Sequence, residues 1–144
     1  MEIKIIKILF NLVNKAYKKE ETPVAAVIIY NNKIIAKSYN KRNKTNKTID
    51  HAEILAIQKA NKKLKSWRLN KCSMYVTIKP CDMCMNVIRE ARINKVYYLI
   101  NRLEEKKIYN KTEIIPLNSK EIENLKENYL KKVTNFWKNK RNKI

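Results

Sequence analysis

Two short stretches carry the strongest signal in the sequence: His51-Ala52-Glu53, and Pro80-Cys81-Asp82-Met83-Cys84, which begins 27 residues after Glu53. His51 is the single histidine of the 144 residues. Cys81 and Cys84 stand three apart, which puts both thiols on one side of a helix's first turn, where the helix dipole favours thiolates. One imidazole and two thiols suit Zn²⁺, and three protein ligands instead of four are typical of a catalytic site with a position left for water. We therefore predict a zinc site at His51, Cys81 and Cys84.

Glu53 is the candidate catalytic residue beside this site. Residues i and i+2 of a regular helix point to nearly opposite faces, so His51 and Glu53 can share a site only if the metal lies beyond the helix's first residue. The pattern thus predicts two helix starts that face one zinc ion. Zinc lowers the pKa of its water to about 7, and a nearby carboxylate can carry protons in the following steps. A structural zinc site would need a fourth ligand, and we expect the remaining cysteine, Cys72, to be a buried strand residue.

The chain around these stretches alternates helices and strands. Apolar spacing predicts helices over Ile3–Tyr17, His51–Leu64, a segment that begins at Pro80, and about 119–140, the last with a capping box at Asn118 and Glu121. Strand-like runs occupy Val24–Tyr30, Ile34–Tyr39, Cys72–Ile78 and Lys95–Ile100, with a weaker one at Thr112–Pro116. We expect the Asn40–Thr48 segment to be an exposed basic loop, and Asn31-Asn32 to turn a hairpin. This order predicts an α/β fold with helices on both faces of one sheet, in a single domain over residues 1–144 that closes with a basic tail.

Charge is the strongest compositional feature. Lys and Arg number 33 against 13 Asp and Glu, which gives a formal charge of +20 and attracts polyanions such as RNA. The chain also contains 27 Lys, 20 Ile and 19 Asn, residues that AT-rich coding over-produces, so coding bias is the alternative source of the charge. Glycine is absent, either through the same bias or through engineering. The basic loop before His51 and the basic C-terminal segment are candidate RNA-binding surfaces, with Lys41, Arg42, Lys44, Lys138 and Arg141 as candidate contacts.

Three cysteines with one close pair do not form a disulfide framework, and a reducing compartment suits them better. No signal peptide and no apolar stretch of ~18 residues is present. We therefore expect a soluble, cytoplasmic protein with no membrane partner.

Several segments together resemble the bacterial tRNA-specific adenosine deaminases of the TadA type, within the cytidine-deaminase-like superfamily. The resemblance covers about Glu21 to Ile100. It is carried by Thr22-Pro23-Val24-Ala25-Ala26-Val27, Tyr39-Asn40, His51-Ala52-Glu53-Ile54, Trp67-Arg68-Leu69, Tyr75-Val76-Thr77 and Pro80-Cys81-Asp82-Met83-Cys84. The spacing of the His and Cys motifs also matches the general zinc nucleobase deaminase signature.

The resemblance implies a three-layer sandwich around a central mixed sheet of five strands, a homodimer, and hydrolysis of adenosine to inosine at the wobble position of a tRNA anticodon loop. It implies that Asn40 contacts the flipped base, that Val24 and Ala25 line its pocket, and that the C-terminal helix lies along the anticodon loop. The chain departs from the family pattern in three places: Ala25 replaces a glycine, Lys79 replaces a glutamate, and the segment from Asn101 lacks the usual Gly-rich Arg-Asp loop.

Three other interpretations stay open at this point. A deaminase of free guanine or cytosine would use the same zinc motif, with an incidental basic surface. A zinc-stabilised RNA-binding module would need no turnover, although such a module has no use for a proton carrier at Glu53. An engineered glycine-free deaminase would have altered activity.

Overall fold

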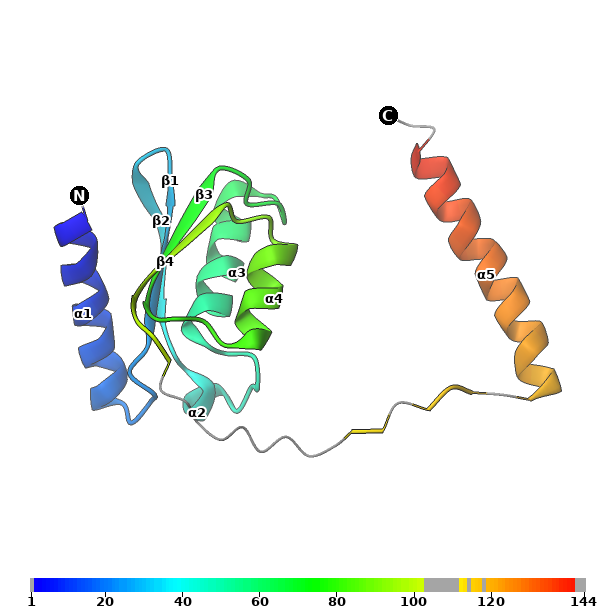
Figure 1. The fold of residues 1–144 in the computed structure, drawn as a ribbon, viewed down its shortest axis with the longest axis horizontal. Helices are drawn as coiled ribbons and strands as arrows, with labels where there is room; N and C mark the ends of the chain where they lie inside the picture. The colour runs from blue at the N-terminus through cyan, green and yellow to red at the C-terminus, as the bar shows by residue number, and fades with distance from the viewer. Residues whose placement is uncertain (1, 103–111, 114, 118, 142–144) are drawn as a thin grey trace. The chain divides into compact units, whose positions relative to one another are not determined.

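A computed structural model describes residues 2–102, 112–113, 115–117 and 119–141. The chain divides into two compact units, Met1–Glu105 and Lys106–Ile144. The elements of the first unit, in chain order, are α1 (Glu2–Lys18), β1 (Ala25–Tyr30), β2 (Lys33–Tyr39), α2 (Arg42–Thr45), α3 (Ala52–Leu64), β3 (Cys72–Ile78), α4 (Asp82–Glu90) and β4 (Lys95–Ile100) (Figure 1). The second unit contains α5 (Lys120–Arg141). The predicted strands β3 and β4 have the observed bounds, and the expected basic loop contains the short helix α2.

The first unit is built on a mixed sheet in the order β2-β1-β3-β4. Strand β1 is antiparallel to both β2 and β3, whereas β3 and β4 are parallel because α4 forms the crossover between them. The β1–β2 hairpin turns at Asn31 and Asn32, whose φ angles of 50° and 60° fit a type I′ turn. The predicted hairpin is therefore confirmed, with asparagine in the place usual for glycine.

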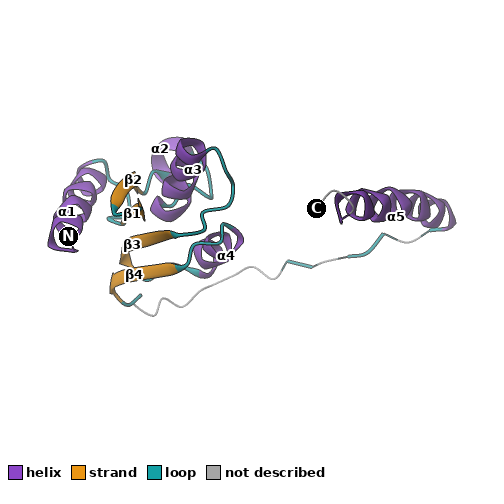
Figure 2. Cartoon of the chain, turned by 90° about the horizontal axis from the view of Figure 1, so that it is seen from above, coloured by secondary structure: helices purple, strands orange, loops and turns teal. Residues whose placement is uncertain are grey.

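Helices cover both faces of this sheet, as predicted (Figure 2). Helix α1 packs on one face, where Ile5 and Leu9 join Val27 of β1 in a buried cluster. Helices α3 and α4 pack on the other face, where Ile57 and Ile88 join Met74 of β3 in the larger cluster. The strand residues alternate between the two clusters, which fixes the register because a shift by one residue would exchange the faces.

Helix α1 has the predicted position, but of the predicted stripe only Leu9 is fully buried. The sequence pattern points to a stripe that includes Phe10 and Tyr17, yet these side chains are 48% and 74% exposed. The buried residues are Ile5, Leu9, Leu12 and Ala16. Both sets have helical spacing, so apolar periodicity alone does not choose between them. Packing against the sheet selects the stripe that includes the small Ala16.

Within the described ranges, seven residues, none of them glycine, adopt positive φ angles: Glu20, Asn31, Asn32, Asn46, Lys65, Lys71 and Arg92. Two of them end helices, since Asn46 and Lys65 are the left-handed C-caps of α2 and α3. These are positions where glycine is the common choice, because a Cβ atom makes the left-handed conformation costly.

The second unit confirms the predicted C-terminal helix, which begins after Ser119. The Ser119 hydroxyl accepts a hydrogen bond from the N–H of Ile122 at 3.2 Å, as an N-cap does. The predicted cap residue Asn118 lies outside the described residues. The predicted fifth strand at Thr112–Pro116 is not confirmed: residue 114 lies outside the description, and its described neighbours are in no helix or strand. Among the described residues, no helix is both long and apolar enough to cross a membrane.

Candidate active site

The three predicted metal ligands meet where two helices begin. His51 is the N-cap of α3 and Cys81 is the N-cap of α4, both with extended backbone, and Cys84 lies in the first turn of α4. The Nδ1 atom of His51 lies 3.4 Å from the Sγ of Cys84 and 3.7 Å from the Sγ of Cys81. All three candidate donor atoms lie within 4.8 Å of one another. The two helix starts therefore face one point, as the spacing predicts.

The size of this triad fits a tetrahedral zinc ion. With Zn–S near 2.3 Å and Zn–N near 2.0–2.1 Å, tetrahedral geometry separates a nitrogen and a sulfur ligand by about 3.6 Å. The observed N···S distances of 3.4 and 3.7 Å lie on either side of that value. One imidazole and two thiols are also donors that zinc prefers. The group can therefore hold a metal ion.

Glu53 lies in the first turn of α3, next to the triad, and is only 3% exposed. Its Oε1 atom is buried and has no hydrogen-bond partner within the described part of the chain. Burial raises the pKa of the Glu53 carboxyl, and its own backbone N–H, Cys84 and the positive charge of Arg102 oppose that shift. A buried carboxylate oxygen without a partner is costly, which indicates a group kept for a ligand.

Burial also shifts the pKa values of two of the candidate ligands, His51 and Cys84. It lowers the pKa of His51, with help from the charges of Arg42 and Arg102, and so favours the neutral imidazole that a metal needs. It raises the pKa of the Cys84 thiol, as do the neighbouring Glu53 and Cys81. A bound cation would favour the thiolate at Cys84, because a metal ion deprotonates a coordinating thiol.

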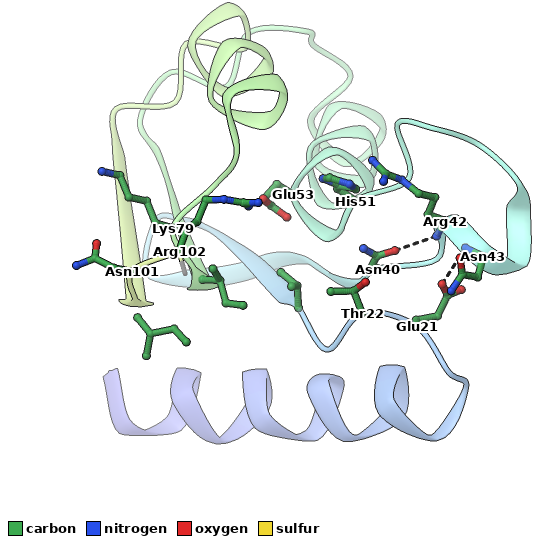
Figure 3. A pocket seen from close by; sticks show the side chains of 13 residues that line it. Glu21, Thr22, Asn40, Arg42, Asn43, His51, Glu53, Lys79, Asn101 and Arg102 are labelled. Carbon is green, nitrogen blue, oxygen red and sulfur yellow. Dashed lines mark hydrogen bonds between the residues drawn. The ribbon is translucent and has the colours of Figure 1, made fainter. Parts of the chain in front are cut away.

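A pocket of about 360 Å³ opens beside the triad, and Figure 3 shows its lining. His51 and Glu53 belong to this lining, and we call these two residues the pocket floor. The other lining residues come from the segment before β1, the end of β2, α2, and the ends of the parallel strands β3 and β4: Glu21, Thr22, Val24, Asn40, Arg42, Asn43, Ile78, Lys79, Ile100, Asn101 and Arg102. The carboxyl ends of parallel strands are where α/β sheets commonly bind ligands.

Two of the three expected substrate-binding residues line this pocket. Asn40 is 6% exposed, and its Oδ1 accepts the backbone N–H of Arg42 at 2.9 Å. Val24 lies in the wall. Ala25 is fully buried in the cluster beneath α1, and it is not among the lining residues. Its N–H donates to Thr77 Oγ1 at 3.2 Å.

The expected RNA contacts lie in different places. Arg42 lines the pocket, Lys44 is exposed on α2, and the Lys41 ammonium lies 5.0 Å from the centre of the Tyr39 ring. Lys138 is exposed on α5, and Arg141 is the last residue of that helix. The last two therefore belong to the second unit.

Glu21, a buried residue that no sequence pattern marks, supports the pocket wall. The two carboxylate oxygens of Glu21 accept the backbone N–H groups of Asn43 and Lys44 at 2.8 and 3.0 Å. Arg102 was likewise not singled out as a pocket residue. The signal available for it was position, since it follows the end of β4 as Lys79 follows the end of β3.

Comparisons with known proteins agree with this geometry. A family model described as MafB19-like deaminase matches residues 2–141. The tRNA-specific adenosine deaminase of Bacillus subtilis (strain 168) is 35% identical, over 70% of this chain and 70% of its own. That of Rickettsia bellii is 42% identical over 58% of this chain, which spans only 59% of that relative.

Solved structures show the same likeness. A structure from studies of A-to-I editing by tRNA:A34 deaminases has a TM-score of 0.69 and 32% identity, over 70% of this chain and 78% of the other. Guanine deaminase from Bacillus subtilis has a TM-score of 0.67 and 31% identity, over 70% and 65%. Because the family match covers residues 2–141 and the Bacillus adenosine deaminase matches over 70% of both chains, this chain belongs to the MafB19-like deaminase family, as a TadA-type protein of the cytidine-deaminase-like superfamily.

Proposed function

We propose that this protein is a zinc-dependent hydrolytic deaminase that converts adenosine to inosine at the wobble position of a tRNA anticodon loop. The relatives named as tRNA-specific adenosine deaminases support the substrate. The observation that carries the chemistry is the position of Glu53: it lines the same pocket as His51 of the metal-binding triad, and its buried Oε1 has no hydrogen-bond partner among the described residues.

His51, Cys81 and Cys84 would hold the zinc ion. When bound, Zn²⁺ lowers the pKa of a water molecule to about 7 and so supplies a nucleophile near neutral pH. Glu53 carries the protons: its Oε1 takes one from the attacking water and delivers it to the ring nitrogen beside the amino-bearing carbon. Glu53 then takes the proton of the new hydroxyl on that carbon and passes it to the amino group, which leaves as ammonia as the carbonyl of inosine forms. Adenosine and water thereby give inosine and ammonia.

Asn40 and Val24 would hold the base over this floor. The Oδ1 of Asn40 already accepts the N–H of Arg42, which fixes the amide plane and leaves its Nδ2 as the donor to a ring atom of the base. Val24 supplies an apolar wall. An anticodon loop suits this pocket, because an unpaired loop base needs little energy to leave its stack.

The test is inosine formation in a synthetic anticodon stem-loop with adenosine at the wobble position, compared with free guanine and free cytosine. We expect inosine with the wild type, loss of about 10²–10⁴ in rate with Glu53→Gln, and no change with Glu90→Gln, an exposed acid at the end of α4. Turnover of guanine or cytosine without inosine would transfer the assignment to a free-base deaminase.

The proposal extends to the assembly. We propose one deaminase domain over residues 1–144 with a fifth strand near residues 112–116, since the family match runs through both units. We also propose a homodimer, in line with the resemblance, and a cytoplasmic location, where tRNA is available and the three free cysteines stay reduced. Light scattering that gives the 17.2 kDa of one chain at micromolar concentration would contradict the dimer.

A further inference from the structure

The exposed charged residues of the pocket lining, which we call the rim, are positively charged. Among the described residues, three exposed lining residues carry charge, Arg42, Lys79 and Arg102, and all are cations. The two carboxylates of the lining, Glu21 and Glu53, are buried. Both oxygens of Glu21 are already used by backbone N–H groups. A ligand that reaches the rim therefore meets positive charge only.

These cations lie on two sides of the pocket floor. Lys79 and Arg102 follow the parallel strands β3 and β4, and Figure 3 shows them together on one side of Glu53. Arg42 lies on the other side, beyond His51. Its backbone N–H is bound by Asn40 Oδ1, and its Nε donates to the carbonyl of Thr48 at 3.0 Å. A base that enters between the two sides would have a cation near each of its flanking phosphates.

No carboxylate neutralises these three side chains within the described part of the chain. Arg102 lines the pocket together with His51 and Glu53, and Figure 3 shows its side chain extending toward Glu53, beside the metal-binding triad. Like charges repel, so a cation there opposes the binding of a metal cation. An anion bound at the rim offsets that repulsion. A free base such as guanine or adenine carries no anion at neutral pH, whereas each nucleotide in a strand has a phosphate on either side.

We infer that Lys79 and Arg102 bind the phosphate on one side of the target nucleoside and Arg42 binds the phosphate on the other, so that the site selects a base within an RNA strand. This inference rests on the proposed function and adds to it the residues that discriminate a strand from a free base. It also gives a role to Lys79, the residue that directly precedes the Pro80-Cys81 pair.

The first experiment measures binding, so that it does not depend on turnover. The anisotropy of a labelled anticodon stem-loop is followed with the zinc-loaded Glu53→Gln protein, alone and combined with Lys79→Met, Arg102→Met or the control Lys95→Met, an exposed lysine at the start of β4. We expect each rim variant to weaken binding about tenfold and to reduce the slope of log K against log salt by about 0.7, the value for one phosphate on a single strand. Lys95→Met should change neither quantity.

The second experiment replaces each phosphate that flanks the wobble nucleoside with a neutral methylphosphonate. On the substrate without its contacted phosphate, Lys79→Met should cost nothing further, because the two changes remove the same interaction. Equal losses on native and neutral substrates would overturn the inference. Turnover of 5′-AMP as efficient as that of the stem-loop would overturn the assignment to a strand. A wild type that binds the stem-loop with the expected rim dependence but forms no inosine would refute the proposed function and leave this inference standing.

Discussion

The Nδ1 of His51 lies 3.4 Å from the Sγ of Cys84, although 33 residues separate them in the chain. The contact joins the starts of α3 and α4, two helices on the same face of the sheet that belong to one buried cluster. A metal at this point thus links two segments that are distant in sequence. Its removal is expected to affect both the chemistry and the stability of the fold.

Variants of the triad and of Glu53 should separate binding from catalysis. Cys84→Ser should lose zinc and lower the thermal midpoint, because an ion that binds only the native state stabilises it by about 2.7 kcal/mol at one hundred times its Kd. Glu53→Gln should keep both the zinc and the midpoint while turnover disappears. Zinc content by mass spectrometry, together with a thermal scan, checks this pair. Loss of zinc in Glu53→Gln would mean that Glu53 is a ligand and not a proton carrier.

Glu21 should be needed for the position of α2. In Glu21→Ala the N–H groups of Asn43 and Lys44 lose their acceptor, so we expect a loss of about 1–3 kcal/mol in the free energy of unfolding and faster exchange of these two amides. The Michaelis constant should rise, since Arg42 and Asn43 line the pocket. Urea unfolding and amide hydrogen exchange measure the two effects. The control is Glu20→Ala, an exposed neighbour whose side chain should matter little.

Ala25→Gly tests where this side chain acts. Its methyl group is fully buried under α1 and outside the pocket lining, so the variant should lower the free energy of unfolding by about 1–2 kcal/mol through lost burial and added chain entropy. The Michaelis constant for the stem-loop should stay within a factor of two of wild type. A large change in that constant with unaltered stability would restore the substrate-contact role that the family resemblance implies.

Glycine should stabilise the chain at its left-handed turns. Lys65 ends α3 with φ 52° and ψ 42°, a conformation that costs an L-residue roughly 1–2 kcal/mol. Lys65→Gly should therefore raise the free energy of unfolding by about 0.5–1 kcal/mol after the added entropy of the unfolded chain is subtracted. Gln58→Gly, in the exposed middle of the same helix, should lower it by a similar amount. If Lys65→Gly destabilises in urea titrations, the strain at this cap is smaller than the conformation implies.

The sequence predicted the metal-binding cluster well because its geometry is local. Spacing alone put His51 and Cys81 at helix starts, and the structure confirms both as N-caps. The prediction that α/β layers enclose a mixed sheet is confirmed for the same reason, since each element has its own period and turn signals. These patterns are properties of short segments, and short segments are what a single sequence displays.

What depended on packing was harder to predict. The stripe of α1 that faces the sheet was assigned to residues such as Tyr17 instead of Ala16, because both stripes have the same period. The support from Glu21 spans 22 residues and leaves no periodic trace. The fifth strand and the cap at Asn118 fall on or beside residues outside the described ranges, and they stay predictions.

The left-handed residues of the described ranges show how this fold forms its turns without glycine. The fold requires left-handed backbone at these positions, which asparagine, lysine, glutamate and arginine occupy in place of glycine. Each such residue has an energetic cost that the packing of the domain offsets. Drift toward codons rich in A and T can thus remove every glycine while the topology persists. Such drift would lower the free energy of unfolding and leave the topology unchanged. A return to glycine at any one of these turns would recover part of that free energy.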